Sequence, residues 1–228
     1  MDSDIQLMAW HGWGFDHTCW RSWENILPDH IRISLFNRGY RGEQRDITFT
    51  GRSARNIVFA HSFGLHLCPP SQLARADLVV IFGGVRGMHP EAAQFNRRSK
   101  LVLGNMIEAM REDPGAVIRK FMQNCYRPDP APEIDIQNYR FEKLRHDLQV
   151  LNECSLEVEP LTKAKKICIL HGSSDKIVPK AKGRELYNLL SRHSSYFEVK
   201  GAGHALPFTH TEQCWAFIEP ELRSTGTD

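Results

Sequence analysis

The chain has 228 residues, of which 41% are hydrophobic and 25% are charged, and this composition is ordinary for a soluble globular protein. A formal net charge of +2, with no basic run that carries interleaved aromatic residues, argues against a nucleic-acid partner. No stretch approaches the roughly 20 apolar residues of a membrane span, and the N-terminus lacks the pattern of a signal peptide, so we expect a cytoplasmic protein without a membrane partner.

Six short apolar runs are each followed by turn residues, and they lie at 5–10, 31–36, 56–60, 78–82, 167–170 and 196–199. Runs of this length that are rich in Val, Ile and Phe are typical of strands buried on both faces, as in parallel sheets. Helix-compatible stretches separate most of them. The pattern therefore predicts an α/β protein with a mostly parallel central sheet flanked by helices.

The alternation is interrupted once, between the fourth and the fifth predicted strand. Helical patterns cover about 94–126, with Pro114 starting a second helix, and about 138–154, and a proline-rich loop at 127–132 separates them. We predict a helical cap at 86–160, inserted into a core formed by 1–85 and 161–228. The alternative is an ordinary helical crossover between two strands. A simple crossover needs only a dozen or so residues, and the segment 86–160 is much longer than that.

Six cysteines are scattered along the chain without a CxxC pair. In a cytoplasmic protein such residues are usually reduced thiols, so we expect no metal site and no cofactor. They are Cys19, Cys68, Cys125, Cys154, Cys168 and Cys214.

Ser62 is the candidate nucleophile. It lies in the segment Ala60-His61-Ser62-Phe63-Gly64, directly after the third predicted strand. A nucleophile elbow is a tight strand-to-helix turn that exposes a serine hydroxyl, and small residues flank the serine because the two backbones pass very close. The alternative for this pentapeptide alone is a serine in an ordinary turn.

The turn His11-Gly12-Trp13-Gly14 follows the first predicted strand, where hydrolases place one donor of the oxyanion hole. We expect the backbone N–H of Trp13 to be that donor and the backbone N–H of Phe63 to be the second. Two fixed donors would stabilise the negative charge of a tetrahedral intermediate.

Asp175 and His204 complete a candidate triad. Asp175 follows the fifth predicted strand, and His204 lies on a glycine-containing loop beyond the sixth. In this interpretation His204 is the general base and Asp175 orients it, and the chain order Ser, Asp, His is that of the α/β-hydrolase fold. Asp147 is the alternative acid, although it lies within a predicted cap helix.

Four segments resemble the pimeloyl-acyl-carrier-protein methyl ester esterases of biotin synthesis, and the likeness extends over almost the whole chain. They are the opening His11-Gly12-Trp13-Gly14-Phe15 with Trp20, the elbow around Ser62, the segment from Gly172 to Pro179, and Gly203-His204-Ala205-Leu206-Pro207-Phe208. The resemblance implies a serine carboxylesterase that removes the methyl group from a pimeloyl-carrier-protein. Its partners would be an acyl carrier protein and a small-molecule ester, and we expect a monomer.

The carrier would dock on the cap through its acidic helix. Residues 97–127 include seven basic and three acidic side chains, a local net charge of +4 that could steer an acidic partner. The alternative is a solvated helix face of mixed charge. The candidate docking residues are Arg97, Arg98, Lys100, Arg111, Arg119 and Lys120, and a second basic cluster after the second strand comprises Arg38, Arg41, Arg45, Arg52 and Arg55.

Candidate residues for an acyl channel are Trp13, His61, Phe63, Phe121 and Met122, and plain core packing is the alternative for each of them. Two other functions stay open at this point. The chain could be a general short-chain carboxylesterase, or a catalytically silent hydrolase fold that serves as a binding protein.

Overall fold

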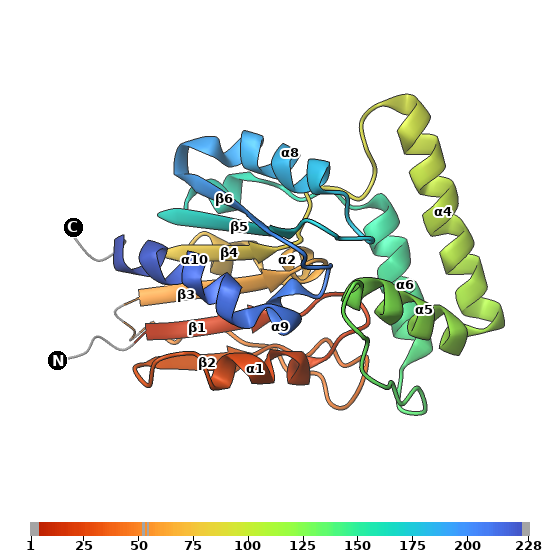
Figure 1. Cartoon of the computed structure of the whole chain (residues 1–228), viewed down its shortest axis with the longest axis horizontal. Helices are drawn as coiled ribbons and strands as arrows, with labels where there is room; N and C mark the ends of the chain where they lie inside the picture. The colour runs from red at the N-terminus through yellow and green to blue at the C-terminus, as the bar shows by residue number, and fades with distance from the viewer. Residues whose placement is uncertain (1–4, 52, 54, 225–228) are drawn as a thin grey trace.

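The computed structural model describes residues 5–51, 53 and 55–224. Six parallel strands form one sheet in the order β2-β1-β3-β4-β5-β6 (Figure 1). Each predicted apolar run is a strand, so the predicted fold class is confirmed. The strands are β1 (Ile5–Trp10), β2 (Ile31–Leu35), β3 (Arg55–His61), β4 (Leu78–Phe82), β5 (Lys166–Gly172) and β6 (Ser194–Val199).

Helices cover both faces of the sheet, and each face buries its own hydrophobic cluster. Side chains alternate across a strand, so Leu7 and Phe59 face one layer while Met8 and Val58 face the other. The first layer holds η1 (His17–Trp20), α1 (Arg21–Glu24), α9 (Leu206–Thr209) and α10 (Thr211–Ser224). The second layer holds α2 (Gly64–Leu67), α3 (Pro70–Leu73), α7 (Glu159–Thr162) and α8 (Lys180–Leu190), and η2 (Ser191–His193) leads from α8 into β6.

Three of the four helices described between β4 and β5 stand beyond the carboxyl ends of the strands (Figure 1). They are α4 (Ala93–Glu112), α5 (Pro114–Tyr126) and α6 (Phe141–Glu153). They pack around a third hydrophobic cluster, which includes Ile107, Ile118 and Leu144 and extends to the core residues Trp13 and Phe63. We refer to α4, α5 and α6 as the cap.

The boundaries of the cap helices follow from local chemistry. Helix α5 begins at Pro114, as predicted, and the Asp113 carboxylate accepts a hydrogen bond from the Ala116 N–H at 2.8 Å. Helix α6 begins at Phe141, three residues later than predicted, and the backbone N–H of Arg140, the residue before it, donates to the Tyr40 carbonyl at 2.8 Å. The expected boundary at residue 160 falls inside α7, whose Leu161 is buried in the core.

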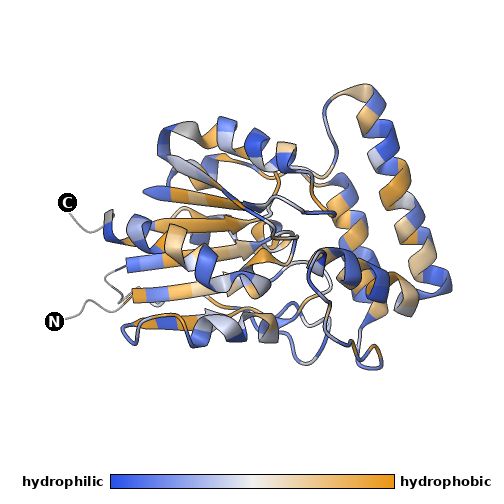
Figure 2. Cartoon of the chain, viewed as in Figure 1, coloured by the Kyte–Doolittle hydropathy of each residue, from blue (hydrophilic) through white to orange (hydrophobic). Residues whose placement is uncertain are grey.

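None of the described helices combines the length and the apolar character that crossing a bilayer requires. The hydrophobic side chains lie mostly along the central strands and on the inner faces of the helices (Figure 2).

Candidate active site

Ser62 lies in a strained turn at the carboxyl end of β3. Its φ of 52° is in the left-handed region, where no other described non-glycine residue lies. The turn is held because the Ser62 N–H donates to the Phe82 carbonyl of the neighbouring strand at 2.9 Å. Helix α2 starts at once and passes so close to β1 that a Cβ at Gly64 would lie 2.4 Å from the Trp10 carbonyl oxygen. The hydroxyl of Ser62 is therefore presented at the sheet edge, and the side chain is partly exposed.

The structure brings Ser62, His204 and Asp175 into one chain of hydrogen bonds. The distance from His204 Nε2 to Ser62 Oγ is 2.9 Å, and the distance from His204 Nδ1 to Asp175 Oδ2 is 2.7 Å. An ionised carboxylate can only accept, so Nδ1 carries the proton and the Nε2 lone pair faces the serine hydroxyl. This is the tautomer that a general base needs.

Asp175 is held as a carboxylate. Its second oxygen, Oδ1, accepts the backbone N–H groups of Ile177 and Val178, both at 2.8 Å. Burial alone would raise the pKa of Asp175, but the neighbouring His204 and the Val178 N–H bring it below its usual value. Asp147, the alternative acid, has no contact with His204: it accepts hydrogen bonds from Arg38 and Tyr40 instead.

The loop that carries His204 rests on the cap. The Ala205 N–H donates to the Cys125 carbonyl in the last turn of α5 at 2.9 Å. A Cβ at Gly203 would lie 2.0 Å from the carbonyl oxygen of Arg127, so only glycine allows the loop to approach this closely. On its other side His204 is supported by His61, whose Nε2 lies 3.1 Å from the His204 carbonyl oxygen.

Trp13 and Phe63, the predicted donors of an oxyanion hole, lie in turns close to Ser62. Gly12 lies against the nucleophile, because a Cβ there would be 3.0 Å from the Cβ of Ser62. Among the described residues, neither the Trp13 N–H nor the Phe63 N–H donates a hydrogen bond to another protein group. Both donors therefore remain available to a ligand beside Ser62.

Four of the five residues predicted to line an acyl channel fall into two groups, and the fifth, Phe63, lines the pocket described below. Trp13, Phe121 and Met122 lie together at the junction of the core and α5, with the Trp13 and Phe121 rings perpendicular and their centroids 4.7 Å apart. His61 is fully buried between Phe15 and Phe208, behind the ring of His204. Its place indicates a supporting contact to His204.

A pocket of about 330 Å³ lies next to the elbow, between α2, α3 and α7 of the core and α6 of the cap. Its walls are mainly apolar, and they include Phe63, the residue after Ser62. The sequence did not predict this pocket, because its two sides are far apart in the chain. Its other lining residues include Leu67, Leu73, Val150, Leu156 and the polar Arg38, His66, Asp147 and Cys154.

The six candidate docking residues are all exposed on α4 and α5, and Arg111 forms an ion pair with Glu108 at 2.8 Å. The second basic cluster is differently engaged. Arg38 and Arg41 pair with Asp147 and Asp16, and Arg55 donates to the Leu222 carbonyl. Arg52 lies outside the described residues.

Four histidines with depressed pKa values make stability depend on pH. Burial lowers the pKa of His11 from 6.5 to about 4, and burial also lowers the pKa values of His61, His66 and His171. As the pH falls below 6.5, the unfolded chain takes up protons that the folded chain refuses, so the free energy of unfolding is expected to fall. His11 alone should account for about 3 kcal/mol between pH 6.5 and 4, at about 1.4 kcal/mol per pKa unit.

Urea unfolding at pH 7, 6 and 5 measures this loss. The variant His11→Asn serves as the comparison, because it removes one titrating group and should show a shallower slope. A free energy of unfolding that is constant from pH 7 to pH 5 would contradict the assignment of these histidines as buried and neutral.

No protein-family model matches the chain. Among solved structures, the chain is similar to an esterase (EaEST) from Exiguobacterium antarcticum, with a TM-score of 0.78, 13% identity, and coverage of 98% of this chain and 93% of that one. It is also similar to a bromoperoxidase from Bacillus anthracis, with a TM-score of 0.71, 15% identity and coverage of 95% and 92%. MenH from S. aureus has a TM-score of 0.71, 14% identity and coverage of 99% and 96%. At these identities the likeness shows a shared architecture, and the chain has the α/β-hydrolase fold.

One curated protein matches over a shorter stretch. A protein of Rickettsia felis described as a fatty acid oxidation complex trifunctional enzyme is 29% identical over 103 residues. That stretch covers 44% of this chain and 14% of the other protein. The match is therefore confined to a small part of that protein.

Proposed function

We propose that the chain is a serine carboxylesterase that acts through an acyl-enzyme on Ser62. The observation that carries the proposal is the hydrogen-bonded series Ser62–His204–Asp175 at 2.9 and 2.7 Å, in a strained turn at a strand end. Similarity to structures described as esterases supports the same reaction class.

The geometry suits a two-step reaction. Ser62 Oγ attacks the carbonyl carbon of the ester while its proton passes to His204 Nε2, and Asp175 stabilises the imidazolium that forms. The carbonyl oxygen becomes an oxyanion facing the N–H groups of Trp13 and Phe63, each worth about 3 kcal/mol of barrier. The intermediate collapses, the alcohol leaves with the proton from His204, and a water activated by the same histidine then hydrolyses the acyl-enzyme.

We further propose that the substrate is the methyl ester of a pimeloyl-carrier-protein, as the resemblance of the four segments implies. The exposed residues of α4 support a carrier that is acidic. Helix α4 exposes Phe95, Leu101 and Val102 beside Arg97, Arg98 and Lys100, which makes a mixed apolar and basic surface.

Methyl release from a pimeloyl-carrier-protein methyl ester, measured beside hydrolysis of short p-nitrophenyl esters, tests both parts of the proposal. Faster turnover of the carrier-bound ester supports the biotin-synthesis substrate. Turnover of the short esters alone indicates a general short-chain carboxylesterase. No turnover and no labelling by a fluorophosphonate probe would indicate a catalytically silent fold.

Reversing two cap charges is expected to separate docking from chemistry. Arg119 and Lys120 are exposed on α5, so Arg119→Glu with Lys120→Glu should lower kcat/KM for the carrier-bound ester by roughly tenfold at low salt, since removing rim charges mainly slows association. The loss should shrink at high salt because the Debye length shortens. Hydrolysis of a free short ester should be unchanged.

The matched control is Lys163→Glu with Lys165→Glu. Both lysines are exposed just before β5, at the opposite end of the sheet from the cap, and they pair with Glu159 and Asp77. An equal loss of kcat/KM for the carrier-bound ester in the two double variants would show that only the net charge of the protein matters. The reversals should also be made at Arg97, Arg98 and Lys100. If none of them changes the ratio of activity on the carrier-bound ester to activity on the free short ester, the carrier does not dock on this part of the cap.

A further inference from the structure

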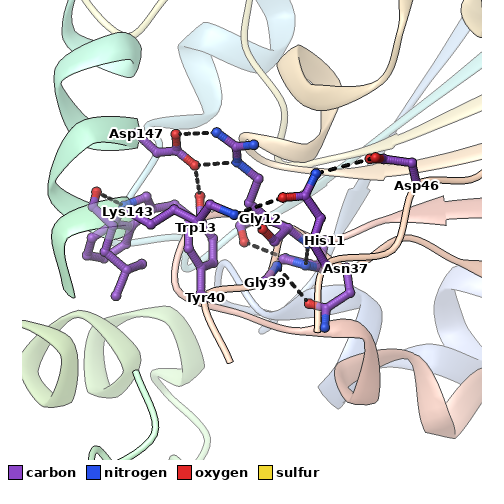
Figure 3. Close-up of polar contacts among 12 residues, drawn as sticks. His11, Gly12, Trp13, Asn37, Gly39, Tyr40, Asp46, Lys143 and Asp147 are labelled. Carbon is purple, nitrogen blue, oxygen red and sulfur yellow. Dashed lines mark hydrogen bonds and ion pairs between the residues drawn. The ribbon is translucent and has the colours of Figure 1, made fainter. Parts of the chain in front are cut away.

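A buried ion pair fastens the cap to the core beside the active site. Asp147 lies on α6 with a side chain only 1% exposed, and its carboxylate accepts hydrogen bonds from Arg38 Nε at 2.7 Å and Arg38 Nη2 at 2.8 Å. The Tyr40 hydroxyl donates a third hydrogen bond at 2.7 Å (Figure 3). Arg38 and Tyr40 belong to the loop after β2, so these three hydrogen bonds join that loop to α6 through Asp147.

The same loop is bonded to the turn that carries the Trp13 N–H. The backbone N–H of Arg38 donates to His11 Nε2 at 3.1 Å. Because that nitrogen accepts, the proton of the neutral ring must be on Nδ1, which lies 2.9 Å from the Gly12 carbonyl oxygen and donates to it (Figure 3). Burial keeps the pKa of His11 at about 4, so this arrangement holds at neutral pH.

The bond to the Gly12 carbonyl fixes the direction of the oxyanion donor. In a trans peptide the C=O of one residue and the N–H of the next point in opposite directions. The Gly12 oxygen is held by His11 and also by the Phe15 N–H at 3.3 Å. The Trp13 N–H therefore points away from those two groups, and Gly12 itself lies against Ser62.

Helix α6 holds the side chain of the same residue. The indole Nε1–H of Trp13 donates to the Leu144 carbonyl at 2.8 Å, and Lys143 Nζ donates to the Arg38 carbonyl at 2.8 Å. Trp13 is thus held through its backbone by the β2 loop and through its ring by α6. Asp147 and Lys143, both on α6, join these two supports to each other through Arg38.

We infer that Asp147, through Arg38 and Tyr40, is a positioning residue for the oxyanion-hole donor Trp13. The inference rests on the proposed function, in which Trp13 donates to the oxyanion. It adds that a residue of the cap helix, which touches neither Ser62 nor His204, sets how well the transition state is stabilised. A displacement of α6 would then weaken the stabilisation of the transition state as well as change the shape of the pocket.

The test is the variant Asp147→Asn, which keeps the size of the side chain and removes the charge that Arg38 pairs with. Removing an oxyanion donor outright lowers kcat by about 10²- to 10³-fold, so a displaced donor should lower kcat by about tenfold. KM for a short p-nitrophenyl ester should change by less than about twofold, because the donor acts on the transition state. The affinity for a trifluoromethyl ketone, which forms a tetrahedral adduct with Ser62, should fall by the same factor as kcat/KM.

Glu142→Gln is the matched control. It breaks the Arg145–Glu142 ion pair, 2.6 Å long, on the same helix, and that pair makes no contact with the oxyanion turn. The control should keep the wild-type kcat and the wild-type affinity for the ketone. If Asp147→Asn does not fold, Tyr40→Phe is tested in its place. It removes one of the three hydrogen bonds to Asp147 and should cause a smaller loss of kcat and of affinity for the ketone.

The inference is overturned if the chosen variant keeps the wild-type kcat and ketone affinity. It is also overturned if only KM rises, since this would place Asp147 in substrate binding alone. These outcomes differ from a failure of the proposed function, in which the wild-type protein would neither hydrolyse an ester nor react with a fluorophosphonate.

Discussion

Replacing Ser62 with alanine is expected to lower kcat by about 10⁴- to 10⁶-fold while leaving the fold intact. The alanine cannot form the acyl-enzyme, and the His204 base is left without a proton to accept. His204→Ala should cause a loss of similar size, and the double variant should be no worse than either single variant, because the two residues act as one unit. Asp175→Asn should lower kcat by about 10⁴-fold, since the amide would favour the wrong tautomer of His204.

The measurements are kcat on a p-nitrophenyl ester and covalent labelling by a fluorophosphonate. Ser71→Ala is the control, because Ser71 is an exposed serine on α3, away from the elbow. It should keep full activity and full labelling. Wild-type turnover by Ser62→Ala would show that the nucleophile has been assigned to the wrong residue.

Replacing Gly64 with alanine is expected to cost about 3 kcal/mol or more in the free energy of unfolding. The added Cβ would lie 2.4 Å from the Trp10 carbonyl oxygen and 2.7 Å from the His11 carbonyl oxygen. Both atoms belong to the backbone at the end of β1, so neither can move aside as a flexible side chain would. The elbow would have to open, and this would also displace Ser62.

Urea unfolding gives the free energy, with Gly104→Ala as the matched control. Gly104 lies within α4, and nothing is within 4 Å of the Cβ it would gain. Since alanine is the better helix former by about 1 kcal/mol, that variant should be slightly more stable than the wild type. If Gly64→Ala were as stable as Gly104→Ala, the close approach of α2 to β1 would not be the reason for glycine at the elbow.

The fold was largely predictable because its strands are buried on both faces and their apolar runs are short and bounded by turns. The contacts among Ser62, Asp175 and His204 were predictable for a related reason. Each of these residues follows a different strand, and the carboxyl ends of parallel strands meet at one edge of the sheet. The sequence signals for these residues are local, so they required no knowledge of how distant segments pack.

The contacts between cap and core could not be predicted in the same way. Arg38 and Asp147 are 109 positions apart, and no local pattern pairs them. One signal was present: Asp147 stands between Leu144 and Leu148 on the buried face of α6, where a charge requires a partner. The position of His61 behind His204 also depends on tertiary packing, because the elbow motif alone does not show which way the side chain points. The monomeric state and the cytoplasmic location stay predictions.

The support that α5 gives to the His204 loop limits how this protein could be re-engineered. The Cys125 carbonyl holds the Ala205 N–H, and the Arg127 backbone fits against Gly203 with no room for a side chain. A chimera that exchanged the whole cap for that of another hydrolase would lose both contacts, and with them the placement of the general base. A junction placed before the last turn of α5 would keep the catalytic histidine in place. The exposed face of α4 could then be exchanged to recruit a different partner, while its buried residues Leu103, Ile107 and Met110 would have to be kept.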